Sequence, residues 1–471
     1  MPLRLTSAVV ALLLGACSSR SFPAQHRSGS GGDSGVASAA WSLQTLDTSA
    51  LSNGQSDNLP NTLPQLAMAV GTDDTVGVAF YAPQGLNDAG AQLYDLRYLS
   101  WKAGVASASQ TITNVRNVSG LSVAFAQPGG SPAVSFLGGA YPPPGSPLWT
   151  QANAAVAFAS GGPQGGGWTL HIAAVGDDTL GTKVCPEPGG DLFDNKGTVV
   201  GLDTALVFIH GKAQVAYRDV HYGQGTGTVD SDFGGSDLKL ASGGPTSWTY
   251  APVDCSKAAP EQGGHGGHTQ LVVGDDGFGA LVEDTEPAGD VPGVGVYFRK
   301  QDSSGLWSHP TTALGGPFGD LPQGGPQDTL SGPTLSYDSQ VGYGVAVYDN
   351  SAHKLFYTES TSPLTRWSTS LPLVGSGSQG WYPSLAFDPV AHQPSVAFYY
   401  CSSTPGKSQS GCSVSEQSLQ IISRLGGNWQ TPQVVDSAGA LLPKLGFLST
   451  GKRVIVYKDP FTGFLKLAAE K

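Results

Sequence analysis

Charged side chains are scarce in this sequence of 471 residues, and basic ones are the scarcer kind. Lys and Arg together number 24 against 36 Asp and Glu, so the formal net charge is −12. Nucleic acid and anionic lipid surfaces are both held through clusters of basic residues, and this balance argues against either as an electrostatic partner. Hydrophobic residues still make up 39% of the sequence, and 66 Gly and 33 Pro supply turns, so a folded protein with many turns is expected.

Helical periodicity and long apolar runs are also missing. Beyond the first residues, no long stretch repeats apolar side chains every 3.6 positions, so few helices are expected. The apolar run Ser7–Ala16 follows Arg4 and is too short to cross a bilayer as a helix. A basic start followed by a short apolar core is typical of a secretory signal peptide.

The end of this run, from Leu14 to Cys17, resembles the lipobox of bacterial lipoproteins. The resemblance implies that residues 1–16 are a signal peptide, that cleavage falls before Cys17, and that the Cys17 thiol carries a lipid. It also implies a lipid-anchored protein of the bacterial cell envelope, with Ser18 favouring the outer membrane. Residues 17–40 are predicted to be the lipidated cysteine and a flexible tether rich in Ser, Gly and Ala. A plain signal peptide with an incidental cysteine is the alternative.

A pattern of four β-type runs repeats along residues 41–471. Its clearest copy lies between Tyr382 and Asp436, where short runs rich in Val, Ala, Phe and Tyr are bounded by turn residues. Seven copies follow one another, and the first two runs of each copy are almost wholly apolar. A repeat of this length indicates a β-propeller, in which four-stranded blades form a ring and neighbouring blades cover each other.

The last copy is incomplete, and its missing run stands at the other end of the sequence. Only three runs follow Leu442, while a fourth run with a leading Trp and a terminal Asp is found at Trp41–Asp47. We therefore predict an all-β, seven-bladed propeller of four-stranded antiparallel blades, closed by pairing of Trp41–Asp47 with the C-terminal blade. A Trp opens the fourth run of every copy except the first, and we interpret it as a wedge between blades.

In this rhythm, residues 41–471 resemble the sialidase-like β-propeller repeats of bacterial surface proteins. The stretch nearest to the sialidase Asp-box is Asp302–Trp307. Its Gly stands one place late, and the Ser before Asp and the Thr before Trp are missing. No arginine triad is identifiable either. The resemblance therefore implies the fold without sialidase activity.

Five cysteines are present, and four of them follow Cys17. An exported protein lies in an oxidising compartment, so an even number of cysteines suggests two disulfides. Proximity in the predicted ring favours the pairs Cys401–Cys412 and Cys185–Cys255. A zinc site is the alternative, although no CxxC spacing occurs.

Long insertions gather on one face of the predicted ring. Chain reversal places the connections after the second and the fourth strand of every blade on the same face, which we call the loop face. Several connections there are long, such as residues 138–153, 220–236 and 401–417, whereas the turns between first and second strands are tight. Binding residues concentrate on loops held by a rigid scaffold, so the loop face is the predicted ligand side. Unconstrained drift of loop length is the alternative.

Polar residues of blades 3 and 4 form the predicted centre of a site on the loop face. They are Arg218, Asp219, His221, Tyr222, His265, His268 and Glu283. The three histidines among them, His221, His265 and His268, could hold zinc or manganese through neutral imidazoles. The spaced carboxylates of Asp230–Asp237 could form a calcium loop, although the twelfth-position Glu is missing. Solvated surface side chains are the alternative to a metal site.

Aromatic and acidic residues at other strand ends extend this site around the mouth of the ring. They are Asp349, Tyr382, Tyr399 and Asp459. Such mixtures suit carbohydrate, because rings offer stacking surfaces and carboxylates accept hydrogen bonds from hydroxyls. No segment carries a specific catalytic motif, so we predict a monomeric binding module for glycan or a surface protein. The alternative is a carbohydrate-active enzyme, either a glycosidase or a metal-assisted polysaccharide lyase.

Overall fold

The chain divides into two units, Met1–Gly35 and Val36–Lys471, and all the described residues belong to the second. The computed structural model describes residues 40–49, 66–86, 92–115, 118, 120–126, 130–139, 153–175, 199–221, 235–255, 264–286, 295–314, 332–349, 354–361, 366–369, 371–373, 378–402, 412–413 and 415–471. The predicted signal peptide, Cys17 and nearly all of the tether lie outside these ranges. Within them, no helix has the length and apolar character needed to cross a membrane.

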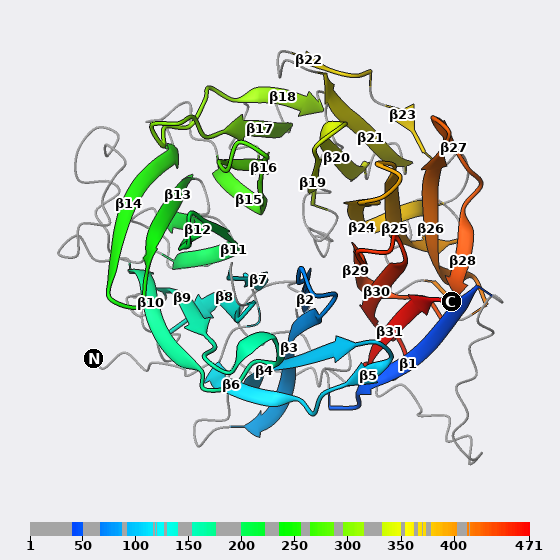
Figure 1. The fold of residues 1–471 in the computed structure, drawn as a ribbon, viewed down its shortest axis with the longest axis horizontal. Coiled ribbons are helices and arrows are strands. Elements are labelled where there is room, and N and C mark those ends of the chain that lie inside the picture. The colour runs from blue at the N-terminus through cyan, green and yellow to red at the C-terminus, as the bar shows by residue number, and fades with distance from the viewer. Residues whose placement is uncertain are drawn as a thin grey trace, which may run out of the picture. The chain divides into compact units, whose positions relative to one another are not determined.

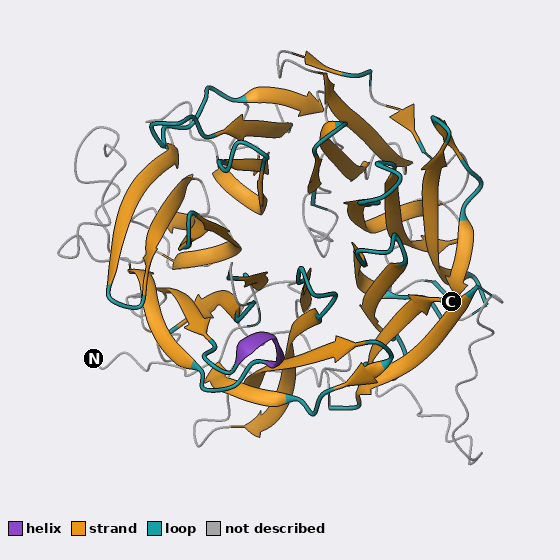
Figure 2. Ribbon diagram, in the orientation of Figure 1, coloured by secondary structure: helices purple, strands orange, loops and turns teal. Residues whose placement is uncertain are grey.

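Seven antiparallel blades form a ring around a central axis, which confirms the predicted propeller (Figure 1 and Figure 2). Blade 1 contains β2 (Leu66–Val70), β3 (Val76–Leu86), β4 (Gln92–Lys102), β5 (Val105–Ala106) and β6 (Gln110–Val115). Blade 2 contains β7 (Ser122–Phe125), β8 (Pro132–Gly138), β9 (Asn153–Phe158) and β10 (Thr169–Val175). Blade 3 contains β11 (Val199–Ile209), β12 (Lys212–His221), β13 (Gly235–Gly244) and β14 (Ser247–Asp254). In blade 1 the outermost strand is split into two short pieces, β5 and β6, and both pair with β4.

The remaining blades repeat this arrangement. Blade 4 contains β15 (Gly264–Val273), β16 (Gly279–Glu286), β17 (Val296–Lys300) and β18 (Thr311–Leu314), and blade 5 contains β19 (Thr334–Asp338), β20 (Gly342–Asp349), β21 (Lys354–Thr361), β22 (Arg366–Trp367) and β23 (Leu371–Pro372). Blade 6 contains β24 (Ser378–Phe387), β25 (Pro394–Cys401), β26 (Gln417–Leu425), β27 (Asn428–Trp429) and β28 (Gln433–Asp436). Blade 7 contains β29 (Leu441–Phe447), β30 (Arg453–Lys458), β31 (Leu465–Glu470) and β1 (Trp41–Asp47). Blades 3 and 4 are further joined by a parallel bridge between Ser236 and Gly264.

Blade 7 is built from both ends of the propeller. Its strand order is β1-β31-β30-β29, and β1 pairs antiparallel with β31 from Trp41 opposite Glu470 to Asp47 opposite Leu465. The Trp41 side chain is completely buried. The pairing predicted for Trp41–Asp47 is therefore the one found, and β1 lies beside the C-terminus in Figure 1.

The inner strands are apolar because blades cover them on both faces. Every residue of β8 is buried, as expected for a second strand that is packed between two neighbouring sheets. Hydrophobic clusters shared by neighbouring blades form the core: one contains Phe136 of blade 2 and Tyr98 of blade 1, and another contains Val156 of blade 2 and Val215 of blade 3. The core is consequently a series of layers between blades.

The tryptophans that open the fourth strands fill these layers. Trp168, Trp367 and Trp429 pack against Tyr98, Phe298 and Tyr357 of the preceding blade, with ring centroids 5.2, 5.0 and 5.0 Å apart respectively. Blade 1 has no such Trp, but Trp101 at the end of its third strand is buried and donates through Nε1 to Gln44 Oε1 of blade 7. In blade 1, Trp101 therefore takes the place of the tryptophan that opens the fourth strand of the other blades.

The aspartates that end the fourth strands also connect blades. Tyr457 of blade 7 donates its hydroxyl to Asp436 Oδ2 of blade 6 at 2.6 Å. Arg299 of blade 4 forms an ion pair with Asp254 of blade 3. Because these groups lie at blade boundaries, they hold neighbouring sheets at a fixed distance.

The turn that was compared with the Asp-box is formed despite its altered sequence. Asp302 Oδ1 accepts hydrogen bonds from the backbone N–H groups of Ser304 at 2.8 Å and Leu306 at 3.0 Å. The side chain therefore closes the turn between β17 and β18, which is a structural role.

Candidate functional site

The first strands of four blades contain the same bulge near the loop face. In each case two residues of the first strand lie opposite one residue of the second strand, between two flanking pairs of partners. The flanking partners are Leu202/Arg218 and Ala205/Ala216, Gly267/Asp284 and Gln270/Val282, Trp381/Tyr399 and Ser384/Ala397, and Leu441/Lys458 and Lys444/Val456. An extra residue of this kind bends a strand and redirects its side chains.

Each bulge places one residue in the left-handed backbone region. These residues are Asp203 (φ 50°), His268 (φ 45°), Tyr382 (φ 54°) and Leu442 (φ 53°). Residues other than glycine rarely adopt this backbone conformation. It costs of order 1 kcal/mol and is concentrated at functional sites. Its repetition at one position of four blades indicates that the packing around the axis imposes it.

The bulges surround a cavity of about 240 Å³ on the axis of the ring. Residues in or next to the first strands of all seven blades line it, including Asp203, His268, Thr334, Tyr382, Ser384 and Lys444. The approach is close: a Cβ on Gly332 would lie 2.3 Å from the Cβ of His268, so glycine is required where blade 5 meets blade 4. The first strands therefore present acidic, basic, aromatic and hydroxyl groups to one space.

A buried charge network lies beside this cavity at the ends of blade 3. Lys239 Nζ lies 2.6 Å from Asp219 Oδ2 and 3.6 Å from Asp237 Oδ2. Arg218 donates through Nε to Ser236 Oγ at 2.9 Å, and its Nη1 lies 4.0 Å from Asp203 Oδ2. Burial alone would lower the pKa of Lys239, but the two carboxylates raise it, so the lysine is charged at neutral pH.

Blade 4 continues the network through Glu283, whose side chain is completely buried. Its Oε2 accepts the backbone N–H of Gly266 at 2.6 Å, and its Oε1 lies 3.4 Å from Arg299 Nε. The same guanidinium pairs with Asp254. A buried carboxylate is stable only when its charge is compensated in this way.

A second lysine between two aspartates lies where blade 7 meets blade 6. Lys466 Nζ lies 2.7 Å from Asp459 Oδ2 and 4.0 Å from Asp436 Oδ2. Burial raises the pKa of Asp459, but hydrogen bonds from Lys466 and from backbone N–H groups outweigh it and lower the pKa. Asp459 is therefore ionised at neutral pH, as an ion-pair partner must be.

The predicted site residues occupy different environments. His268 and Tyr382 line the cavity, while Arg218, Asp219, Glu283 and Asp459 take part in the buried ion pairs. Asp349 is buried at the end of β20, and the buried Tyr399 hydroxyl donates to Gln417 Oε1 at 2.8 Å.

The metal prediction concerns side chains that are only partly described. His221 and His265 belong to β12 and β15, but their side chains, like the whole of Tyr222, lie outside the described residues. Among the residues that are described, no three His, Cys, Asp or Glu side chains are arranged to hold a metal ion. A zinc, manganese or calcium site therefore stays a prediction.

The sequence analysis missed the cavity residues Asp203, Thr334, Ser384 and Lys444. Each lies within the first strand of its blade, where alternation of apolar and polar residues gives no sign of a cavity. One sequence feature could have indicated the bulges. In Asp203-Thr204 and Leu442-Pro443, the residue that precedes Thr or Pro in the first strand is the one in the left-handed backbone region.

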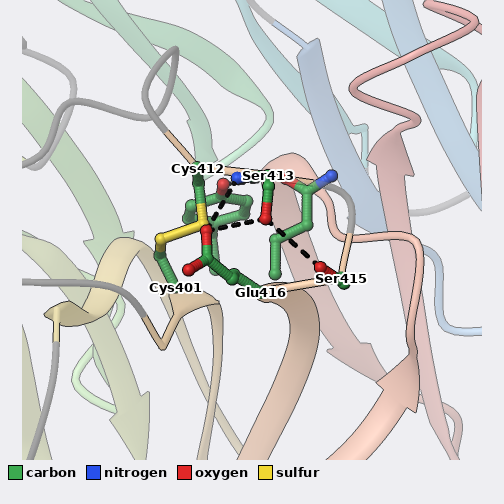
Figure 3. The surroundings of a disulfide bond; sticks show 7 residues. Cys401, Cys412, Ser413, Ser415 and Glu416 are labelled. Atoms are coloured by element: carbon green, nitrogen blue, oxygen red, sulfur yellow. Dashed lines mark hydrogen bonds between the residues drawn. A yellow bond between two sulfur atoms is a disulfide. The ribbon is translucent and has the colours of Figure 1, made fainter.

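One predicted disulfide is present on the loop face. Cys401 at the end of β25 is bonded to Cys412, and beside it Ser413 donates to Glu416 Oε2 through its hydroxyl at 2.7 Å (Figure 3). Cys401 belongs to the core cluster that contains Trp381 and Tyr382, so the bond ties a loop-face connection to the cavity wall. Cys255 is also disulfide-bonded, and its predicted partner Cys185 lies outside the described residues.

Comparisons with known proteins concern the fold alone. No protein-family model and no curated protein matches the sequence. Solved structures that resemble the ring include the Hadza microbial sialidase Hz136, which is 14% identical with a TM-score of 0.47 over 80% of this chain and 73% of that one. The GH93 α-L-arabinofuranosidase of Fusarium graminearum is 13% identical with a TM-score of 0.44 over 91% and 98%. The NanB sialidase of Streptococcus pneumoniae is 11% identical with a TM-score of 0.43 over 89% and 70%. Similarity at this level does not extend to activity.

Proposed function

We propose that this protein is a lipid-anchored recognition module of the cell envelope that binds glycan at the loop-face mouth of its central cavity. The observation that carries the proposal is the repeated bulge, which brings Asp203, His268 and Tyr382 to one cavity from three different blades. An acidic group, an imidazole and a phenol on a rigid frame offer hydrogen bonds to the hydroxyls of a sugar.

Recognition is favoured over hydrolysis by the ion pairs that the neighbouring carboxylates form. Asp219, Asp459 and Glu283 each form an ion pair with a lysine or an arginine. An ion pair stabilises the ionised carboxylate, whereas a general acid in a glycosidase must hold its proton at working pH. These acids therefore support the scaffold rather than proton transfer.

The glycan site is tested by substituting one histidine on each face of the ring. His268→Ala should weaken binding to glycans on an array about tenfold, or by about 1.4 kcal/mol, because a cavity contact is lost. His309→Ala is the matched control, since His309 is an exposed residue of the connection between β17 and β18, on the opposite face. Binding that survives His268→Ala but is lost with His309→Ala would place the site on the wrong face and refute the proposal. Release of sugar from the array would instead favour the enzyme.

The anchor is tested separately. Cys17→Ser should move the protein from the membrane fraction to the soluble fraction, because the thiol that accepts the lipid is removed. Palmitate labelling of the wild-type protein and its loss in the variant are the measurements. A mature N-terminus at any residue other than Cys17 would contradict the anchor, whatever the outcome of the glycan experiment.

A further inference from the structure

Two hydroxyl groups that line the central cavity have no acceptor for their protons among the described residues. Thr334 Oγ1 accepts the backbone N–H of Leu385 at 3.2 Å, and Ser384 Oγ accepts the backbone N–H of Leu445 at 2.9 Å. Each oxygen thus takes a hydrogen bond from the next blade, and its own O–H proton must point elsewhere. Thr334 and Ser384 are 9% and 8% exposed, so both side chains are largely enclosed by protein.

A cation completes this set of donors. Lys444 occupies the position in blade 7 that Ser384 occupies in blade 6, because both follow the left-handed residue of their bulge by two places. Its side chain lines the same cavity, and within the described part of the chain no carboxylate forms an ion pair with it. Burial lowers its pKa to about 8, so it is still mostly protonated at pH 7.

The other ionisable groups that line the cavity are Asp203 on β11, His268 on β15 and Tyr382 on β24. Asp203 lies 4.0 Å from Arg218 Nη1, and that pair belongs to the network of blade 3. The cavity wall formed by blades 5, 6 and 7 therefore presents an ammonium group and two hydroxyl protons, which are all donors. A buried donor without an acceptor is destabilising, so an arrangement of several calls for an acceptor from outside the chain.

We propose that Lys444, Thr334 and Ser384 bind a compact oxyanion in the central cavity, such as the carboxylate of an acidic sugar or a free phosphate. The proposal deepens the glycan-binding function by giving the ligand a charge, and it rests on that function only for the acidic sugar. Charge-assisted hydrogen bonds from an ammonium and from hydroxyls are the usual way to hold such a group. A volume of about 240 Å³ is small for a binding site and fits a single sugar ring or its acidic substituent.

Calorimetric titration with galacturonate, galactose and inorganic phosphate separates the possible sources of the anion. Galacturonate should bind at least tenfold more tightly than galactose at pH 7, and Lys444→Met should abolish this difference while Lys444→Arg retains it. A thermal unfolding midpoint close to that of the wild type shows that each variant is folded. Tight phosphate binding with no preference for galacturonate over galactose would support a site for the free ion and overturn the acidic sugar.

The pH dependence supplies a second readout with a defined sign. The ammonium form is the one that binds, so affinity is full below the pKa of about 8 and falls as Lys444 loses its proton. Between pH 7 and pH 9 the wild-type affinity for galacturonate should fall about tenfold, whereas the Lys444→Arg variant should change little. Equal affinity for all three probes, or binding that is unchanged in Lys444→Met, would overturn the oxyanion site. Neutral glycans that still require His268 would in that case leave the recognition function standing.

Discussion

Deleting residues 41–48 is expected to abolish most of the stability of the propeller. The deletion removes β1, leaves β31 with an unpaired edge, and empties the space of the buried Trp41 side chain. Loss of a buried Trp alone costs about 3–5 kcal/mol, a large part of the 5–15 kcal/mol that stabilises a typical protein. Circular dichroism during thermal and urea unfolding should show a broad transition at a much lower midpoint.

The control for this deletion is a cut of equal length in the predicted tether. Removing residues 28–35 should leave the thermal unfolding midpoint within a few degrees of the wild-type value, because the tether is expected to contribute no stability to the blades. A peptide of residues 41–48 added in excess should restore part of the lost stability by pairing with the open edge. An unchanged midpoint after deletion of residues 41–48 would show that the pairing with β31 does not close the ring.

Arg299→Met is expected to be the most damaging single substitution in the buried charge network. The change removes the guanidinium that pairs with the completely buried Glu283 and the partly buried Asp254. Removing one partner of a buried pair typically costs about 3–5 kcal/mol, since an uncompensated charge remains. The free energy of unfolding from urea titration measures the loss.

Two further variants identify the cause of that loss. Lys102→Met removes the cation from the Lys102–Asp73 pair, whose side chains are 45% and 42% exposed, and should cost less than about 1 kcal/mol. Adding Glu283→Gln to Arg299→Met should recover part of the stability, because the amide is neutral and its oxygen still accepts the N–H of Gly266. A cost for Arg299→Met no larger than that for Lys102→Met would show that the network contributes little.

The fold could be predicted because each feature of a blade is local in the sequence. The apolar first and second strands, the Trp of the fourth strand and its terminal Asp recur at fixed order, and the run Trp41–Asp47 matches the gap left in blade 7. Pairing of Cys401 with Cys412 followed from their place in one connection of the ring. Position in a repeat determines burial in a propeller, so the order of apolar and polar runs along the sequence carries this information.

The candidate site could be predicted only in part, because it depends on side-chain direction. Arg218 and Glu283 were expected at the loop face, but whether a strand-end charge points to solvent or to a neighbouring strand is decided by a bulge. Lys444 lies in a strand that reads as apolar, and its surroundings come from six other blades. No local pattern encodes the contents of a cavity that is shared by the whole ring.

The antiparallel pairing of β1 with β31 also sets an order for folding. Trp41 and Glu470 are close to opposite ends of the propeller sequence, so their contact has to wait until all the intervening blades have been brought together. Contacts between such distant residues carry a large loop-closure entropy and form slowly. Blade 7 is therefore expected to be the last to assemble, and the chain passes through a nearly complete ring whose open edge can pair with another molecule.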